Sequence, residues 1–122
     1  MDIKLELVII PVSDVDRAKD FYVKIGFNPD HDMSPSEGIR FVQLTPPGSA
    51  CSIAIGNGIT EATPGSVEGL QVVVASAEKA REHLVAAGLE IEPVVDLGWG
   101  KFVFFADPDG NKWAVQELPQ YS

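Results

Sequence analysis

The sequence predicts an α+β fold of two tandem βαβββ modules, whose strands form a curved, cupped mixed β-sheet with the helices on the outside. Two observations lead to this prediction. The chain of 122 residues contains two similar halves, and each half reads as a strand, a helix and then further strands. A repeat of about 60 residues in only two copies is too long for a solenoid. We expect a single domain over 1–122, with repeats at about 3–56 and about 66–118.

The repeat is clearest in the two predicted helices. Residues 12–27 (VSDVDRAKDFYVKIGF) align without a gap to residues 74–89 (VASAEKAREHLVAAGL). The first helix has a cap candidate at Ser13 or Asp14, the second has one at Ser76, and each ends at a glycine. Apolar residues at helical spacing then predict one buried stripe on each helix.

Strands are predicted on both sides of each helix. The apolar runs LELVII and LQVVV, which precede the helices, read as strands. After the helices, RFVQLTPPG resembles KFVFFADPDG, and CSIAI aligns with WAVQE, with one residue gained in the second turn. Each half is therefore expected to end in a pair of strands joined by a turn rich in proline and glycine.

Composition excludes several classes of function. Nine Lys and Arg against 18 Asp and Glu give a formal net charge of −9, which argues against nucleic acid and against an anionic membrane surface. No apolar run approaches the roughly 18 residues of a membrane span, and MDIKLELVII does not follow the plan of a signal peptide. The single Cys51 cannot form an internal disulfide, so we expect a cytoplasmic location.

Three segments carry a resemblance to a known family. They are VSDVDRAKDFYVKIGF after the first strand, RFVQLTPPGSACSI, and FADPDGNKWAVQE near the end. In these segments the chain resembles the vicinal oxygen chelate superfamily, which groups glyoxalase I, extradiol dioxygenases and bleomycin-resistance proteins, and it is similar to glyoxalase-like members of unassigned activity. The resemblance implies the paired-module fold and a homodimer. It also implies that catalytic relatives bind a metal through His, Glu or Gln from four strands.

The family's metal positions carry unsuitable residues in this chain. The family pattern places ligands at Leu7 and Ala114, and the internal repeat adds Gly69 and Ser52. Three of the four lack a donor atom, and a serine hydroxyl is a poor sole ligand for the metals concerned. We therefore expect no metal and no other cofactor.

A displaced metal site is the alternative. A shift by one residue brings Glu6, Cys51 and Glu68 to ligand positions, but the same shift would turn every side chain to the opposite face of its strand. We interpret Glu6 and Glu68 as solvated carboxylates and Cys51 as a small buried side chain. His31 is interpreted as an exposed residue of a variable loop over 28–39.

The ligand cavity is expected to be apolar and aromatic. Its predicted lining residues come from the strands and from a tryptophan that lies between two glycines; they are Leu7, Ile9, Ser52, Ala54, Trp99, Phe102, Phe104, Ala114 and Gln116. Aromatic side chains on a concave sheet can stack against a flat organic ligand. The segments 28–39 and 90–100 are expected to set specificity.

The sequence thus predicts a metal-independent small-molecule-binding protein, similar to the bleomycin-resistance branch, that sequesters a toxic or antibiotic compound. One alternative is a metal-dependent enzyme of the glyoxalase or dioxygenase type with non-standard ligands, or metal-free acid–base chemistry by Gln116, Glu117 or His31. Another is a dimerisation or partner-binding module. The sequence leaves open whether the chain is an enzyme. The expected partners are a small-molecule ligand and a second copy of the chain.

Overall fold

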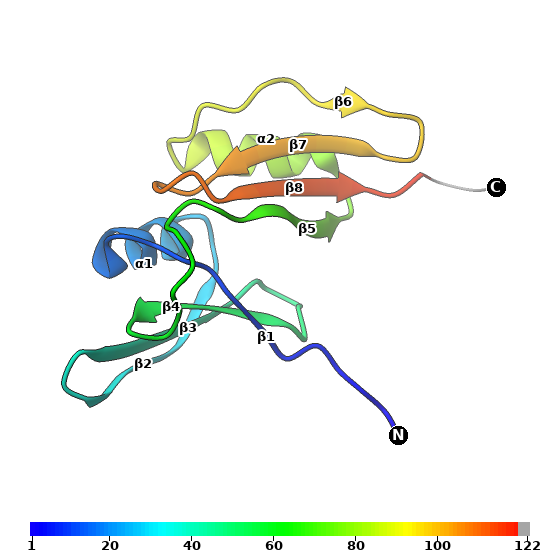
Figure 1. Cartoon of the computed structure of the whole chain (residues 1–122). Coiled ribbons are helices and arrows are strands. Elements are labelled where there is room, and N and C mark those ends of the chain that lie inside the picture. Colours follow the sequence, from blue (N-terminus) through cyan, green and yellow to red (C-terminus); the bar gives the residue numbers. More distant parts are fainter. Residues whose placement is uncertain (120–122) are drawn as a thin grey trace. The chain divides into compact units, whose positions relative to one another are not determined.

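The computed structural model describes residues 1–119 and divides the chain into two compact units (Figure 1). The first unit comprises Met1–Val67 together with Asp107–Asn111, and the second comprises Glu68–Ala106 and the segment that starts at Lys112. Each unit contains one helix and one four-stranded sheet in the order βαβββ, which confirms the predicted fold class. The turn 107–111 lies with the first unit, although it follows β7 in the chain.

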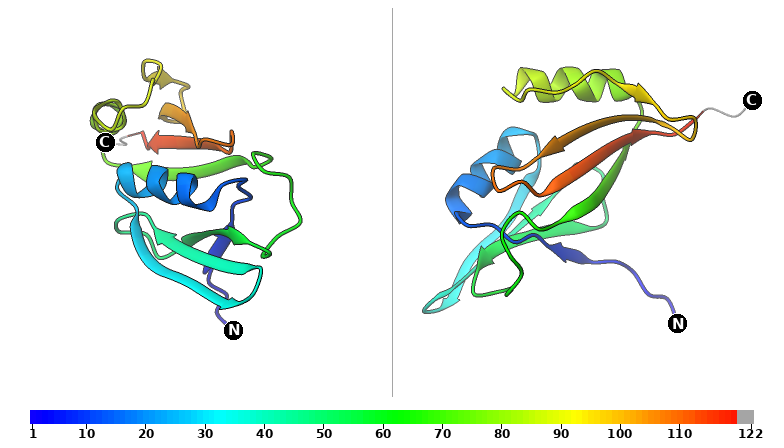
Figure 2. Two further views of the ribbon diagram at one scale, coloured as in Figure 1. Left: turned by 90° about the vertical axis from the view of Figure 1, so that its left-hand side faces the viewer. Right: turned by 45° about the horizontal axis from the view of Figure 1, so that its top comes forward.

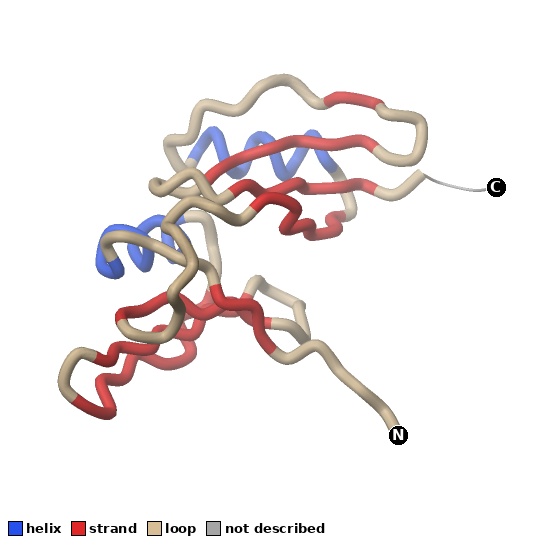
Figure 3. Tube along the Cα trace, in the orientation of Figure 1, coloured by secondary structure: helices blue, strands red, loops and turns tan. Residues whose placement is uncertain are grey.

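The first unit is a mixed sheet with one helix. Its elements are β1 (Leu7–Ile9), α1 (Val15–Lys24), β2 (Asn28–Ser36), β3 (Ile39–Thr45) and β4 (Ser52–Asn57). The strand order is β1-β4-β3-β2, with β1 parallel to β4 and the other pairs antiparallel. Figure 3 distinguishes the helices from the strands by colour. Parallel neighbouring strands need a long crossover connection, and α1, β2 and β3 form that connection between β1 and β4.

The core of the first unit lies between α1 and one face of this sheet. Asp14 is the helix N-cap, since its carboxylate accepts a hydrogen bond of 3.0 Å from the backbone N of Arg17. The buried stripe of α1 includes Tyr22, which is fully buried, rather than the neighbouring Phe21. The other side of the core is supplied by Ile10, which follows β1, and by alternate residues of β3 and β4; these are Val42, Leu44, Ile53 and Ile55.

Ion pairs on the same face connect α1 to β2 and β3. Arg40 on β3 lies 2.8 Å from Asp16 and 2.9 Å from Asp32, and Lys19 on α1 lies 2.8 Å from Asp32. The hydrogen bonds from Arg40 and Lys19 hold the pKa of Asp32 well below its usual range. The Asp32 carboxylate therefore stays charged at neutral pH and joins the helix to the edge of the sheet.

Residues 28–36 form a strand, so the prediction of a variable loop over 28–39 was wrong. The strand β2 pairs antiparallel with β3 through two register irregularities, and all its residues are exposed. Two prolines and the lack of apolar alternation concealed it, because an edge strand is held by backbone hydrogen bonds and tolerates a polar, irregular sequence. His31 consequently lies on a strand, opposite Gln43.

The second unit repeats the plan with a shorter fourth strand. Its elements are β5 (Glu68–Val74), α2 (Ala77–Ala86), β6 (Val95–Asp96), β7 (Lys101–Ala106) and β8 (Lys112–Glu117). The strand order is β5-β8-β7-β6, with β5 parallel to β8. The helix α2 lies along one face of this sheet (Figure 2). Among residues 1–119, none of the helices has the length and apolar character needed to span a membrane.

The core of the second unit is aromatic and aliphatic. Phe105 and Trp113, which face each other across β7 and β8, stack with ring centroids 5.6 Å apart. They are buried together with Val103 and Val115 on the sheet face that packs against Leu84 of α2. Burial of these side chains stabilises this unit by about 25 cal/mol per Å² of apolar area removed from water.

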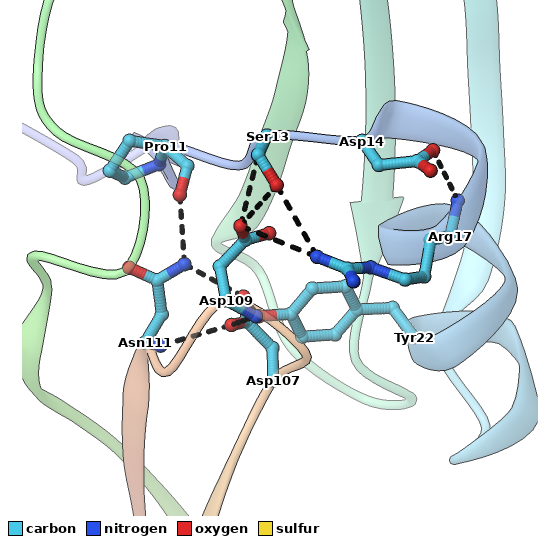
Figure 4. Close-up of polar contacts among 8 residues, drawn as sticks. All are labelled: Pro11, Ser13, Asp14, Arg17, Tyr22, Asp107, Asp109 and Asn111. Atoms are coloured by element: carbon cyan, nitrogen blue, oxygen red, sulfur yellow. Dashed lines mark hydrogen bonds and ion pairs between the residues drawn. The ribbon is translucent and has the colours of Figure 1, made fainter.

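The turn 107–111 is held in the first unit by a buried hydrogen-bond cluster (Figure 4). The Asp107 carboxylate accepts hydrogen bonds from the Tyr22 hydroxyl (2.8 Å), from the backbone N (2.9 Å) and Nδ2 (2.8 Å) of Asn111 and from the backbone N of Asp109 (3.0 Å). Asp109 Oδ1 accepts from the backbone N (3.1 Å) and hydroxyl (2.6 Å) of Ser13. The polar residues of this turn are therefore structural.

Candidate functional site

The face of the second sheet that lies away from α2 carries two rows of side chains. Strand register places residues directly opposite one another on the same face. The first row is Gln71, Ala114 and Phe104, and the second is Val73, Gln116, Phe102 and Val95. We call this surface the helix-free face of the second sheet. Four predicted lining residues lie on this face; they are Phe102, Phe104, Ala114 and Gln116. Beside them lie Gln71 and Val73 of β5, which were not predicted as lining residues.

Aromatic rings contact one another on this face, where Phe102 is buried between two exposed neighbours. The rings of Phe102 and Phe104 stack with centroids 5.9 Å apart and planes within 5°. Trp99, in the turn between β6 and β7, meets Phe102 edge-on at 6.4 Å. Phe104 is 51% exposed, Val73 64% and Trp99 65%. These apolar side chains leave an area in contact with solvent of the kind that a flat ligand can cover.

A chain of amides runs through the same face. Gln116 donates from Nε2 to the backbone carbonyl of Trp99 (3.0 Å) and accepts at Oε1 from Nε2 of Gln71 (2.5 Å). Gly100 lies against this amide, since a Cβ at position 100 would come within 2.5 Å of Gln116 Nε2. The backbone at Gly100 therefore packs closely against the buried Gln116, whose amide is held by its hydrogen bonds to Trp99 and Gln71.

The other predicted lining residues lie on the helix-free face of the first sheet. Leu7 pairs with Ser52, and Ile9 pairs with Ala54. Ser52 and Ala54 are buried, whereas Ile9 is exposed. The Ser52 hydroxyl lies 2.7 Å from Thr45 Oγ1. The nine predicted residues thus fall into two sets, one on each sheet, with Trp99 beside the second set.

The strand register gives a different equivalence between the halves from the one that the sequence predicted. Ala114 pairs with Phe104, and Phe104 corresponds to Gln43 in the aligned strands of the first unit. Gln43 pairs with Ala54, so Ala54, and not Ser52, is the counterpart of Ala114. The predicted alignment failed because it matched the two turn glycines and so assumed a longer second turn, whereas five residues separate β7 from β8 and six separate β3 from β4.

The first strands show the same difference. Ile9 pairs with Ala54 in the first unit, and Gln71 pairs with Ala114 in the second. Gln71 therefore occupies the place beside Ala114 that the sequence assigned to Gly69, which lies at an irregularity of β5. The sequence signal for Gln71 is weak, because it is only a single polar residue within the apolar run LQVVV.

The side chains at the family's metal positions do not fit a metal ion. Leu7 and Ala114 have no donor atom and Gly69 has no side chain, while the amide of Gln71, which the register places beside Ala114, is hydrogen-bonded to Gln116. Within residues 1–119, no group of three or more His, Cys, Asp or Glu could hold a metal. The expectation of a cofactor-free protein stays a prediction.

Among the residues of the displaced site, Glu6 and Cys51 are neighbours beside the β1–β4 pair, where the backbone N of Ser52 donates to the Glu6 carbonyl (2.9 Å). Glu68 is exposed in β5, where Lys112 Nζ is 3.5 Å away, and Glu6 is exposed before β1. Cys51 is partly exposed beside β4. His31 shares the face of Gln43 and Ala54, to which strand alternation does not bring Glu6 or Cys51.

A separate hollow lies at the end of the β6–β7 hairpin. It has a volume of about 390 Å³ and its lining includes Asp96, Lys101 and Glu117. Glu117 already accepts a hydrogen bond of 2.9 Å from the backbone N of Ala77, the first residue of α2. Because its lining is charged and one carboxylate serves the helix, we place the candidate ligand site on the aromatic face and not in this hollow.

Comparisons with known proteins agree on one family. A model of the Glyoxalase/Bleomycin resistance protein/Dioxygenase superfamily matches residues 4–115. The chain is 30% identical to TnmS3, an antibiotic binding protein from Streptomyces sp. CB03234, with a TM-score of 0.87 over 98% of this chain and 99% of that one. No curated protein matches the sequence.

Two further solved structures extend this likeness. A glyoxalase/bleomycin resistance protein from Streptomyces sp. CB03234 is 31% identical, with a TM-score of 0.80 over 93% of this chain and 99% of that one. A superfamily member from Sphaerobacter thermophilus DSM 20745 is 30% identical, with a TM-score of 0.84 over 95% and 98% of the two chains. The similarity therefore covers nearly the full length of each protein.

Proposed function

Because the chain belongs to the Glyoxalase/Bleomycin resistance protein/Dioxygenase superfamily, we propose from the character of its site that it is a metal-independent small-molecule-binding protein. In this proposal it sequesters a toxic or antibiotic compound. The observation that carries the proposal is the pair of exposed aromatic side chains, Trp99 and Phe104, that contact the buried ring of Phe102 on the helix-free face of the second sheet.

Burial of a flat ligand on this surface would supply the affinity. Covering apolar area contributes about 2.5 kcal/mol per 100 Å², part of which offsets the lost freedom of the ligand. The exposed ring of Phe104, supported by the buried ring of Phe102, offers a stacking surface to such a ligand, and the Gln71–Gln116 amides offer directional hydrogen bonds. Apolar burial with a few placed polar groups is typical of small-molecule sites.

Binding without turnover is favoured by the residue types on this face. Its two rows contain only amide, aliphatic and aromatic side chains, so they include no group that exchanges a proton near neutral pH. Glu117 interacts with the start of α2, and His31 lies on β2 in the first unit. TnmS3, which is an antibiotic binding protein, supports the same choice.

We also propose that the protein works as a homodimer in the cytoplasm. The family resemblance supports the dimer, and the single cysteine supports a reducing location. Analytical ultracentrifugation across a range of protein concentrations tests the dimer. A monomer at all concentrations, with ligand binding intact, would remove the dimer from the proposal and leave the binding function in place.

The binding function is tested by equilibrium dialysis of chelator-treated protein against a panel of planar aromatic antibiotics. The expected result is saturable binding of one ligand per chain, with the ligand recovered unchanged by mass spectrometry. Val73→Ser and Phe104→Ser are expected to weaken binding. Val85→Ser is the matched control, since Val85 is an exposed valine on α2, away from the aromatic face.

Each contrary outcome would favour a different function or change one part of the proposal. Chemical conversion of the bound compound would favour an enzyme of the glyoxalase or dioxygenase type. Binding that appears only after a metal is added would overturn metal independence. No binding by any compound, together with a tight protein complex, would favour a partner-binding module.

A further inference from the structure

The first row of the helix-free face contains one position with almost no side chain between two large ones. Ala114 pairs with Gln71 on one side and with Phe104 on the other. Because adjacent strands lie about 4.8 Å apart, the backbones of Gln71 and Phe104 are separated by about 10 Å, and only a methyl group projects between them. A larger residue at 114 would occupy the space between the glutamine and the ring.

The orientation of the amides on this face follows from hydrogen-bond chemistry. The backbone carbonyl of Trp99 can only accept, so the group of Gln116 that faces it must be Nε2. Oε1 of Gln116 then faces Gln71 and must receive a hydrogen from Gln71 Nε2. The carbonyl oxygen of the exposed Gln71 accepts no hydrogen bond from the described residues and keeps its full accepting capacity.

The backbone at Gly100 lies close to the Gln116 side chain. Any Cβ at this position would lie 2.5 Å from Nε2 and 3.0 Å from Cγ of Gln116. The hairpin that carries Trp99 therefore packs directly against the Gln116 side chain, and Gln116 cannot turn its amide over without losing the Trp99 contact. The acceptor presented by Gln71 is thus set by a buried neighbour.

We infer that Gln71 determines ligand specificity: its carbonyl oxygen accepts a hydrogen bond from an O–H or N–H at the edge of a planar aromatic ligand. The ring of that ligand lies over Ala114 and against Phe104. This inference rests on the proposed small-molecule function and adds the chemical class of the ligand, a flat aromatic compound with a hydrogen-bond donor on its rim. A compound whose rim offers only acceptors would leave Gln71 unsatisfied and bind more weakly.

The test compares two probes that share one ring system. 2-Naphthol has an O–H donor, and 2-methoxynaphthalene has a methyl group in place of that hydrogen. Dissociation constants are measured on the full chain by fluorescence titration. Wild-type protein is expected to bind 2-naphthol about five- to tenfold more tightly, which corresponds to one net hydrogen bond.

Three variants separate the role of Gln71 from a general effect on the face. Gln71→Leu should abolish the preference while both probes still bind. Gln43→Leu, which changes a glutamine on the first sheet, should keep it. Ala114→Leu fills the space between Gln71 and Phe104, and it should weaken both probes equally.

The outcomes distinguish this inference from the proposed function. Equal affinity of the two probes for wild-type protein, or a preference that survives Gln71→Leu, would overturn the role of Gln71 and leave small-molecule binding intact. If neither probe binds, and the antibiotic panel does not bind either, the proposed function itself fails.

Discussion

The hydroxyl of Tyr22 donates a hydrogen bond of 2.8 Å to Oδ2 of Asp107, and so joins α1 to a turn 85 residues later in the chain (Figure 4). Both residues are buried, and the same carboxylate receives three further hydrogen bonds from Asn111 and Asp109. A buried carboxylate is stable only when it is well supplied with donors. The bond is therefore a point at which the protein's stability can be tested.

Replacing the Tyr22 hydroxyl should destabilise the protein. Tyr22→Phe keeps the ring and its contact with Phe27 at 5.3 Å, but it removes one donor from a buried charged acceptor. We expect a loss of about 1.5–3 kcal/mol in the free energy of unfolding, measured by urea denaturation. The control is Ser49→Ala, which removes a hydroxyl from an exposed loop and should change stability by less than about 0.5 kcal/mol. Equal effects of the two variants would contradict the structural role of the bond.

Two glycines with similar backbone angles should respond differently to alanine. Gly48 has φ +78° with open space where a Cβ would lie, and Gly65 has φ +80° with the backbone carbonyl of Asp109 in that place. Gly48→Ala should cost about 1 kcal/mol, the penalty of the left-handed conformation alone. Gly65→Ala should cost a further 1–3 kcal/mol, roughly, because the turn 107–111 must move. Urea denaturation of both variants measures the difference in their free energies of unfolding. Similar losses would show that the turn 107–111 moves aside at little cost.

The ion pairs of Asp32 should make stability depend on pH in acid. The pKa of Asp32 lies well below its usual value because Arg40 and Lys19 bind the charged form. Its contribution is therefore complete above the unfolded pKa of about 3.9 and is lost as the pH falls through the lower folded pKa. We expect Asp32→Asn to cost about 1 kcal/mol at pH 7, since the pair is partly exposed.

Unfolding free energies of wild type and Asp32→Asn, measured from pH 7 to pH 2, test the direction of this effect. The difference between the two proteins should stay constant down to about pH 4 and shrink below it. Asp20→Asn is the control, because Asp20 lies on the same helix and no ion pair involves it among the described residues. A difference that grows in acid would contradict the assignment.

Metal removal should leave the protein unchanged if the proposed function is correct. Chelator treatment followed by dialysis is expected to alter neither the ligand affinity nor the unfolding temperature, since the side chains at Leu7, Gly69 and Ala114 offer no ligand. Plasma mass spectrometry of untreated protein, and again after dialysis against zinc, nickel, manganese or iron(II), measures the metal content. Close to one ion per chain would disprove metal independence and direct attention to Glu6, Cys51, Glu68 and His31.

The sequence predicted the helices well and the last strands less well. The helices follow from the gapless match of residues 12–27 and 74–89, where caps and spacing act locally. The counterpart of Ala114 was misplaced by two residues because turns of different length precede β4 and β8. A shift of two keeps the sheet face, so the predicted residues still lie on the helix-free faces.

Two other features depend on packing that the sequence does not reveal. The strand β2 has a polar, proline-containing sequence and is defined by its pairing with β3. Gln71 is a single polar residue in an apolar run, and its relation to Gln116 depends on the parallel register of β5 and β8. Such long-range pairing is set by the whole sheet and not by local propensity.

The assignment of residues 107–111 to the first unit has a consequence for the order in which the protein is built. On the ribosome, Pro11, Ser13 and Tyr22 emerge long before Asp107, Asp109 and Asn111, their hydrogen-bond partners. The amino-terminal half therefore stays incomplete until nearly the entire chain has been synthesised, although its own helix and strands form from local sequence. In this duplicated fold the first unit is therefore complete only after the last quarter of the chain has been synthesised.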